Sequence, residues 1–430
     1  MERRFAGSVR PPCPCKLGCA AVRALWNTQA GRGVLVTLGV LVLVTAIGLA
    51  VLWPRGEALD VQEIVAGETV GGTVTAVIEG GCEEFSAPGC ELLAVELSSG
   101  ADAGRTTTIT LPGDEDKPDV EVGDEIRVLG LDGASGLGFE SDGMPPGSES
   151  VETTYVFIDF ERGFPLLVLA LLFVVLVVGF GRGRGALALC GLAASLALVL
   201  LFVVPAILQG GPPLGVALVG ASAVMLITIS LTHGLGAQSA AAMLGTTCAL
   251  LLTALLAGLF IELAAITGLV TEEARLLRGS SGGTLSLSGL VLAGVVIGAL
   301  GVLDDVTVSQ ASTVMALRRA DPALGARQLY RAALTVGRDH VGATVNTLVL
   351  AYVGAALPVL LIFSTQDVGL GTMLQREAVA KEIVATLVGS IGLIAAMPLT
   401  TGLAAALAVR LPAGVLGHGH AHTHTHTHTH

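Results

Sequence analysis

The sequence is poor in charged and aromatic side chains, and two common catalytic motifs are missing from it. Only 13% of the 430 residues are Asp, Glu, Lys or Arg, and 4% are aromatic. There is no Gly-x-x-x-x-Gly-Lys-Ser/Thr motif, which excludes a recognisable ATP-binding phosphate loop. There is no His-Glu-x-x-His motif, which excludes that type of zinc hydrolase.

Apolar residues take the place of the missing charges. They make up 52% of the chain, and the mean hydropathy is +0.77, which is rare for a soluble globular protein. Long apolar runs predict a mostly α-helical membrane protein with about eight transmembrane helices. The predicted spans are 33–53, 164–181, 185–208, 214–232, 238–266, 288–308, 340–363 and 383–409.

The distribution of charge predicts the orientation in the cell membrane. Fourteen of the 23 basic residues fall in the N-terminal arm, in the loops after the second and sixth spans, and after the last span. Basic residues concentrate on the cytoplasmic side, so we expect both termini in the cytoplasm and residues 55–163 outside. The first span ends in Trp53-Pro54-Arg55 without a small-residue cleavage pattern, so we expect an uncleaved anchor.

These features predict five segments. They are a basic, Cys-containing arm (1–32), a transmembrane anchor (33–53), an acidic extracytoplasmic domain (55–163), a seven-helix core (164–410) and a His-rich tail (411–430). The acidic domain holds 24 of the 35 acidic residues and 5 of the 23 basic ones, which argues against nucleic acid as a partner. This charge fits either the attraction of cations or general solubility.

Short runs rich in Val, Ile and Thr in the acidic domain predict β-strands. The runs are 69–79, 91–98, 106–111, 125–130 and 153–160, with glycine and proline turns between them. Five such strands in about 100 residues are typical of a small OB-like barrel. We expect a disulfide between Cys82 and Cys90 outside the cell, and two free thiols are the alternative.

Two terminal segments contain side chains that bind soft or divalent metals. Cys13, Cys15 and Cys19 show only part of a zinc spacing, which favours a reduced, disordered arm over a metal site. The tail fits either a weak metal-buffering segment or low-complexity sequence without a function. Its alternating imidazoles are His418, His420, His422, His424, His426, His428 and His430. The sequence identifies no definite cofactor. A divalent metal ion is the cofactor that these residues would accommodate.

One face of the predicted sixth span changes from small to polar residues. Its positions follow one another at steps of three or four residues, and they are Gly294, Gly298, Gly301, Asp305, Ser309 and Ser312. The glycines predict close helix packing, within one chain or in a homo-oligomer. Charged groups in a membrane helix usually face a bundle interior or a water-filled path.

Asp304 and Asp305 are the ionisable pair in this span. Asp305 shares the glycine and serine face, and Asp304 points about 100° away. Adjacent carboxylates suit a hard cation or proton coupling. A simple ion pair with Arg338 is the alternative interpretation.

The seventh span begins with polar residues at the same predicted depth. Asp339, Gly342 and Asn346 share one helix face, and Thr347 follows. We expect this face to meet the Asp305 face, with Gly342 allowing close approach.

Residues 301–312 (GVLDDVTVSQAS) and 337–358 (GRDHVGATVNTLVLAYVGAALP) resemble the two signature regions of the YibE/F-like family of multi-pass bacterial membrane proteins. The resemblance covers about 160–410, and the layout is similar from residue 33. It implies a permease whose signature Asp falls on Asp304 or Asp305. Its hydroxyl positions fall on Ser309 and Ser312, and its Arg-Asp and Asn-Thr pairs on Arg338, Asp339, Asn346 and Thr347. This chain has two adjacent Asp residues where the family pattern has a single Asp, so either residue can carry the role of the signature Asp.

Three functions compete. The predicted one is a secondary transporter of a small ion, with a divalent cation favoured and proton coupling an option, because carboxylate, amide and hydroxyl groups lie in the inner half of the sixth and seventh spans. The alternative is an accessory or scaffold subunit whose external barrel docks a partner. A membrane-embedded enzyme ranks last, because Ser309 and Asp305 lack a clear histidine partner. Beyond the lipid bilayer, we expect a small ion or small molecule as substrate.

Overall fold

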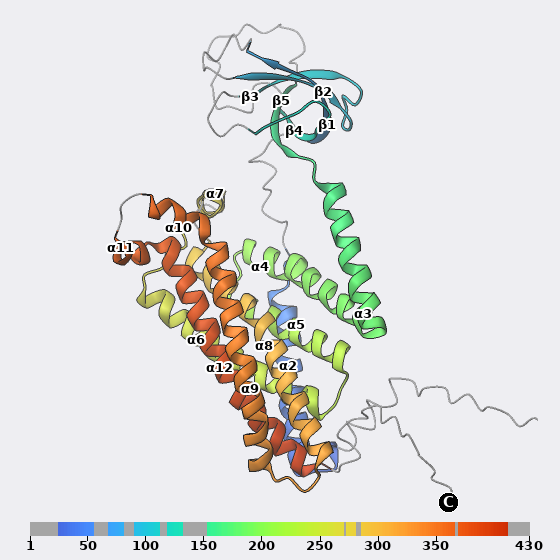
Figure 1. Ribbon diagram of the computed structural model, residues 1–430, viewed down its shortest axis with the longest axis vertical. Coiled ribbons are helices and arrows are strands. Elements are labelled where there is room, and N and C mark those ends of the chain that lie inside the picture. Colours follow the sequence, from blue (N-terminus) through green and yellow to red (C-terminus); the bar gives the residue numbers. More distant parts are fainter. Residues whose placement is uncertain are drawn as a thin grey trace, which may run out of the picture. The chain divides into compact units, whose positions relative to one another are not determined.

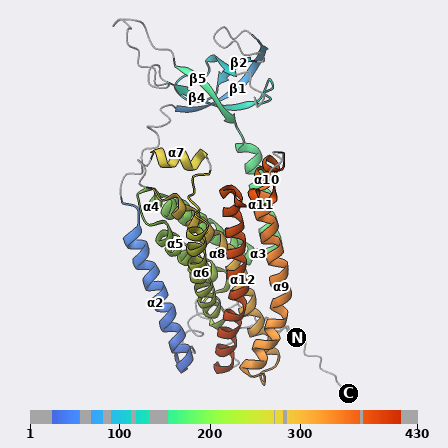
Figure 2. The ribbon, with the colours of Figure 1, turned by 90° about the vertical axis from the view of Figure 1, so that its left-hand side faces the viewer.

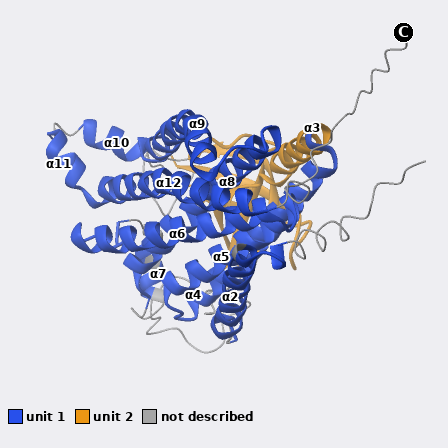
Figure 3. Cartoon of the chain, turned by 90° about the horizontal axis from the view of Figure 1, so that it is seen from below, with its two compact units in different colours: residues 1–59, 181–430 blue, residues 60–180 orange. Residues whose placement is uncertain are grey.

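A computed structural model describes most of the chain. The described residues are 25–55, 68–80, 90–111, 118–131, 153–270, 272–280, 285–365 and 369–411. The chain divides into two compact units, Asp60–Phe180 and Met1–Leu59 with Gly181–His430 (Figure 3). Cys82, the three cysteines of the arm and the histidine tail lie outside the described residues.

The first unit contains a curled, five-stranded antiparallel sheet (Figure 1). Its strands lie within two residues of the predicted ranges, and they are β1 (Glu68–Glu79), β2 (Glu91–Leu97), β3 (Thr106–Leu111), β4 (Glu125–Leu131) and β5 (Thr154–Phe160). The order is β3-β2-β1-β4-β5, because β1 pairs with β4 along its first half and with β2 along its second half. The predicted barrel is therefore present as a half-barrel, since no strand pairing joins β3 to β5 in the described residues.

The half-barrel has its own apolar core. Alternate residues of each strand point inward, as expected for a sheet with one buried face. The fully buried side chains include Val74, Leu93 and Ile126. A polar contact links the turn after β2 to β5, because the Tyr155 hydroxyl donates a hydrogen bond of 2.8 Å to Asp102 Oδ2.

The second unit is helical (Figure 2). Its elements, apart from α3, are α2 (Gln29–Leu52), η2 (Val199–Val203), α4 (Val204–Leu208), α5 (Pro213–His233), α6 (Ala237–Leu263), α7 (Glu272–Ser280), α8 (Leu287–Ala320), α9 (Ala326–Ala355), α10 (Leu357–Ser364), α11 (Leu370–Gln375) and α12 (Glu377–Arg410). Helix α3 (Gly163–Leu198) begins in the first unit and ends in this one.

Several of these helices meet the requirements of a membrane span. Among the described residues, six are long and apolar enough, or seven if α9 and α10, which are bent by 60°, form one span. One of the six is Gly163–Leu208, which covers two predicted spans. This segment breaks at Arg182, with φ 50° and ψ −133°, where the loop between those spans is expected. The number of eight spans stays a prediction.

Helices α6, α8 and α12 pack against one another at the centre of the helical unit. Two glycines allow the close approach of α6 and α12, because a Cβ at Gly245 would overlap Thr400 and a Cβ at Gly392 would overlap Thr253. Small residues let membrane helices approach in this way. The seam is also polar, since Thr246 and Thr307 form a fully buried hydrogen bond of 2.6 Å.

The predicted packing glycines do not lie in such contacts. A Cβ at Gly294, Gly301 or Gly342 would meet no described atom within 4 Å, and at Gly298 it would meet only the Tyr352 hydroxyl, at 3.4 Å. The prediction of close packing at the first three is therefore wrong for contacts among the described residues. Each lies on an exposed face, because the neighbouring alanine, valine and leucine positions of α8 and α9 form the buried one.

Candidate functional site

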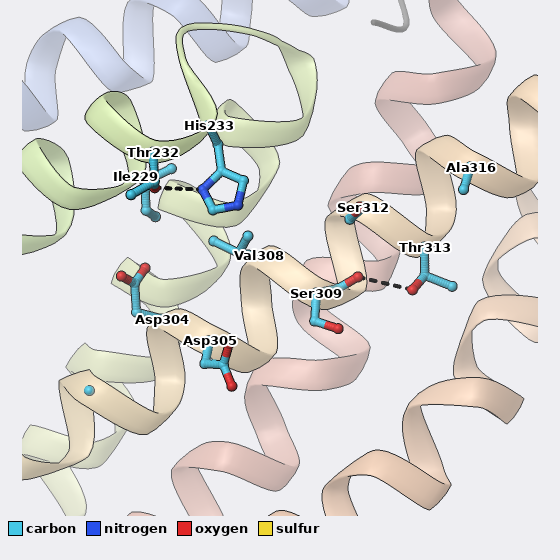
Figure 4. Close-up of a pocket in the computed structure, with 11 residues that line it drawn as sticks. Ile229, Thr232, His233, Asp304, Asp305, Val308, Ser309, Ser312, Thr313 and Ala316 are labelled. Atoms are coloured by element: carbon cyan, nitrogen blue, oxygen red, sulfur yellow. Dashed lines mark hydrogen bonds between the residues drawn. The ribbon is translucent and has the colours of Figure 1, made fainter. Parts of the chain in front are cut away.

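A polar pocket of about 560 Å³ lies between α5 and α8 (Figure 4). One wall is the last turn of α5, with Ile229, Thr232 and His233. The other wall is the α8 segment from Gly301 to Ala316. Its members are Gly301, Asp304, Asp305, Val308, Ser309, Ser312, Thr313 and Ala316. The pocket lies toward the end of the helical unit where α5, α8 and α12 finish, which we call the basic end because Arg318, Arg319 and Arg410 lie there.

Helical periodicity explains the α8 wall. Gly301, Asp305, Ser309 and Ser312 recur at steps of four, four and three, so they share one face, as the sequence predicts. The opposite face, which includes Leu303, Val306 and Gln310, is buried in the bundle. Asp305 is exposed in the pocket, and Ser309 is half-buried.

Asp304 lies at the edge of the pocket nearest to α5 and is half-buried. Thr228 Oγ1 lies 3.2 Å from Asp304 Oδ2 and 2.9 Å from the carbonyl oxygen of Val224. A hydroxyl has one proton, so it donates to one of these acceptors at a time. Asp304 Oδ1 is buried and has no hydrogen-bond partner among the described residues.

An unpartnered carboxylate oxygen is costly away from water, because its lost hydration is not replaced. A proton or a bound cation would satisfy it. Asp304 is thus the strongest candidate for cation binding in the pocket. Its neighbour Asp305 adds a second negative charge on the exposed side.

The end of α5 brings an imidazole to the same pocket. His233 Nδ1 lies 2.7 Å from Thr232 Oγ1, and the tautomer of the ring decides which atom donates. Neither His233 nor Thr228 was predicted as a site residue. The available signal was that both are polar residues in an apolar span, but only the packing of α5 on α8 places Thr228 next to Asp304 and His233 in the same pocket.

Four predicted site residues lie elsewhere. Arg338, Asp339, Asn346 and Thr347 are on α9 and do not line this pocket. All four are exposed, as is Asp305, so among the described residues their face does not pack against the Asp305 face as expected. The buried face of α9 consists of Leu329, Ala333, Gly337 and Val341.

Gly337 takes the role expected of Gly342. A Cβ at Gly337 would overlap Gln310 of α8 and contact Met397 of α12. Gln310 Oε1 in turn lies 3.1 Å from Thr401 Oγ1, whose single proton is shared with the Met397 carbonyl oxygen at 2.6 Å. The contact of α9 with α8 at this depth thus rests on a glycine and a buried amide.

Metal ligands are sparse in the described part of the chain. It contains no group of three or more His, Cys, Asp or Glu side chains placed to hold one ion. Cys90 is buried and disulfide-bonded, but its predicted partner Cys82 is not among the described residues, so that pairing stays a prediction. Cys190 and Cys248 are free thiols.

Comparison with known protein families finds one match, which covers the helices from within α3 to α12. The model of the family described as YibE/F-like protein matches residues 169–410, more than half of the chain. The chain belongs to the YibE/F-like family. The YibE/F-like match includes both walls of the pocket and ends at the last residue of α12. No match is found among curated proteins or among solved structures.

Proposed function

We propose that this YibE/F-like protein is a secondary transporter of a small cation and that Asp304 binds the cation. The observation that carries the proposal is the buried Asp304 Oδ1, which has no partner among the described residues. A charged group in a membrane helix costs about 2.5–3.5 kcal/mol on insertion scales, so a carboxylate left in this state favours a ligand of opposite charge.

The rest of the pocket suits a cation that keeps part of its water. Asp305 and the hydroxyls of Ser309 and Ser312 offer oxygen atoms, which hard cations prefer. A divalent ion that takes all of its ligands from the protein would need more carboxylates or imidazoles than the described residues bring together. We therefore infer that the substrate is a proton or a partly hydrated cation. This class includes a hydrated divalent ion.

The proposed orientation follows from charge. Arg318, Arg319, Arg327, Arg331 and Arg410 lie close to helix ends at the basic end. We infer that this end faces the cytoplasm, because positive residues are retained on that side. The pocket would then be accessible from the cytoplasm, and the β-sheet unit would lie outside.

The test is flux into proteoliposomes that contain the purified full-length chain. Protons and Mn²⁺, Zn²⁺, Co²⁺, Ni²⁺ and Mg²⁺ are offered separately to the wild type and to Asp304→Asn and Asp305→Asn. Asp304→Asn should lower the flux of one ion by at least about tenfold, because the amide cannot carry the charge. Glu262→Gln is the matched control, since Glu262 is exposed on α6 and does not line the pocket.

Two results would contradict the proposal. One is flux that Asp304→Asn leaves unchanged. The other is the absence of flux for every ion from protein that is folded by size exclusion and thermal unfolding. The second result would favour the accessory-subunit function, in which the half-barrel docks a partner and Asp304→Asn does not affect that binding.

A further inference from the structure

Four polar side chains of α8 and α9 take no part in the packing of the helical unit. They are Asp305, Arg338, Asp339 and Asn346, all four are exposed, and we call them the α8–α9 polar face. In the part of the chain that the structure describes, no side-chain hydrogen bond or ion pair involves any of them. Asp305 and Arg338 therefore do not pair with each other within the described chain.

This polar face lies on helices that meet the requirements of a membrane span, α8 alone and α9 together with α10. Asp305 lies near the middle of α8, about 22 Å or more from either end at 1.5 Å per residue. Asn346 lies about 30 Å from the start of α9 by the same measure. Lipid offers no hydrogen bonds, so an exposed carboxylate or amide at such a position favours a partner from outside the chain.

Asp305 lies between Arg338 and Asn346 in depth. Helices α8 and α9 run in opposite directions from a short turn, and the overlap of a Cβ at Gly337 with Gln310 shows which of their positions are level. Counted from that pair, Arg338 lies about 6 Å from the level of Asp305 toward the basic end, and Asn346 lies about 6 Å from it on the other side. The long arginine side chain can span such an offset.

A second copy of the chain is the partner that fits this face. Lipid tails and the wholly apolar segment 164–180 contain no group that could pair with a carboxylate or a guanidinium. The face itself carries both signs of charge and an amide. A two-fold axis along the membrane normal brings groups of equal depth together, so that each residue of one copy meets its counterpart partner in the other. The face is thus complementary to itself.

We propose that two copies of this protein associate through the α8–α9 polar face and that Asp305 of each copy forms an ion pair with the partner subunit's Arg338. The amide of Asn346 extends the polar contact by about one helical turn. Asp305 also lines the pocket that contains Asp304, so the partner subunit's Arg338 contributes to the exposed side of that pocket. The dimer does not depend on cation transport, because it follows from the unpaired groups alone.

The test counts subunits in liposomes of phosphatidylcholine and phosphatidylglycerol. The full-length chain carries one fluorophore, and photobleaching steps are counted at several ratios of protein to lipid. The wild type should bleach in two steps. Asp305→Arg and Arg338→Asp should each lower the association constant by at least about tenfold, because like charges then face each other. Glu262→Arg is the matched control, since Glu262 is an exposed carboxylate on α6, and it should leave the dimer unchanged.

Mixing the two charge-reversal variants tests whether the pair joins two subunits. In a mixed dimer of Asp305→Arg with Arg338→Asp, both contacts again join opposite charges, although neither variant can pair with its own kind. Labelled in two colours, the variants should therefore co-localise with each other about as strongly as wild type with wild type. An ion pair within one chain could not produce this rescue.

Three results would overturn the dimer: single bleaching steps for the wild type at every ratio, dimers of both charge-reversal variants equal to the wild type, or a mixture that associates no better than the single variants. If a charge reversal fails to fold by size exclusion and thermal unfolding, Arg338→Gln and Asn346→Leu replace it, and each should weaken the dimer several-fold. Asp304→Asn should remain dimeric, so a failure of the transport proposal and a failure of the dimer are read from separate measurements.

Discussion

Thr228 Oγ1 lies 3.2 Å from Asp304 Oδ2 and is the described side-chain donor nearest to this carboxylate. Thr228→Val keeps the shape of the side chain and removes the donor, so both Asp304 oxygens would lack a partner. We expect the variant to lose about 1–2 kcal/mol of stability, because a buried acceptor is left unsatisfied. Thermal unfolding in detergent measures this loss.

Asp304→Asn in the Thr228→Val background should cancel most of that loss, because the charge is then gone. Thr344→Val is the matched control, since the Thr344 hydroxyl is bonded only to the carbonyl of His340 in its own helix. Equal destabilisation by Thr228→Val and Thr344→Val would contradict the role assigned to Thr228.

A second prediction compares two glycines of α9. Gly337→Ala should destabilise the protein by about 1–3 kcal/mol, because the new methyl group would overlap Gln310 in a packed seam. Gly342→Ala should be neutral or slightly stabilising, because nothing lies within 4 Å of the added Cβ and alanine favours the helix. Unfolding temperatures of the two variants in the same detergent test this, and the reverse order would show that α9 packs through Gly342.

A third prediction concerns the buried pair Thr246 and Thr307, whose hydroxyl oxygens are 2.6 Å apart. Thr246→Val, Thr307→Val and the double variant form a thermodynamic cycle. We expect a coupling energy of about 0.6 kcal/mol, the usual size for hydrogen bonds between membrane helices. Additive effects would mean that each hydroxyl is satisfied by its own helix, where carbonyl oxygens lie 3.0 Å from Thr246 Oγ1 and 3.1 Å from Thr307 Oγ1.

A fourth prediction concerns the acid stability of the half-barrel. The hydrogen bond from Arg105 lowers the pKa of Asp102 below its ordinary value of 3.8, and the hydrogen bond from Tyr155 acts in the same direction. The ionised carboxylate therefore stabilises the folded state above the ordinary Asp range. That contribution is lost as the pH falls through the ordinary value and then through the lower folded-state pKa.

Asp102→Asn should remove this part of the pH dependence. Hydrogen–deuterium exchange of β2 and β5 peptides in the full-length protein measures it, after correction for the intrinsic effect of pH on exchange. Tyr155→Phe should remove a smaller part, because the Arg105 contact remains. A wild-type profile that Asp102→Asn leaves unchanged would contradict the assignment.

Local patterns were sufficient for the strands and for most of the helices. The strands alternate between buried and exposed residues, and turn residues separate them, so each strand was predicted to within two residues. The apolar runs similarly identify α2, α5, α6 and α12. Helix α8 extends to Ala320 rather than residue 308, because its last turns are polar yet still helical, and a search for apolar runs stops before them.

The candidate site was predicted only in part. The α8 face with Asp305, Ser309 and Ser312 follows from helical periodicity alone. Periodicity does not predict that α5 forms the opposite wall, or that Asn346 lies away from the pocket. It groups residues into helix faces without saying which face meets another helix. On α9, the polar face at Asp339 and Asn346 was expected to point inward, whereas the face with Ala333 and Gly337 does so.

The sequence by itself determined that this is a helical membrane protein of the YibE/F-like family with a β-sheet unit and a carboxylate pair on α8. Composition and periodicity are properties of local sequence, so they can be recognised without knowledge of the tertiary contacts. Only the tertiary structure decided that Asp304 rather than Asp305 is half-buried, that the Thr228 hydroxyl lies beside it, and that His233 lines the same pocket. These relationships depend on how helices distant in sequence pack, and packing is set by side-chain shape at each crossing rather than by any single segment.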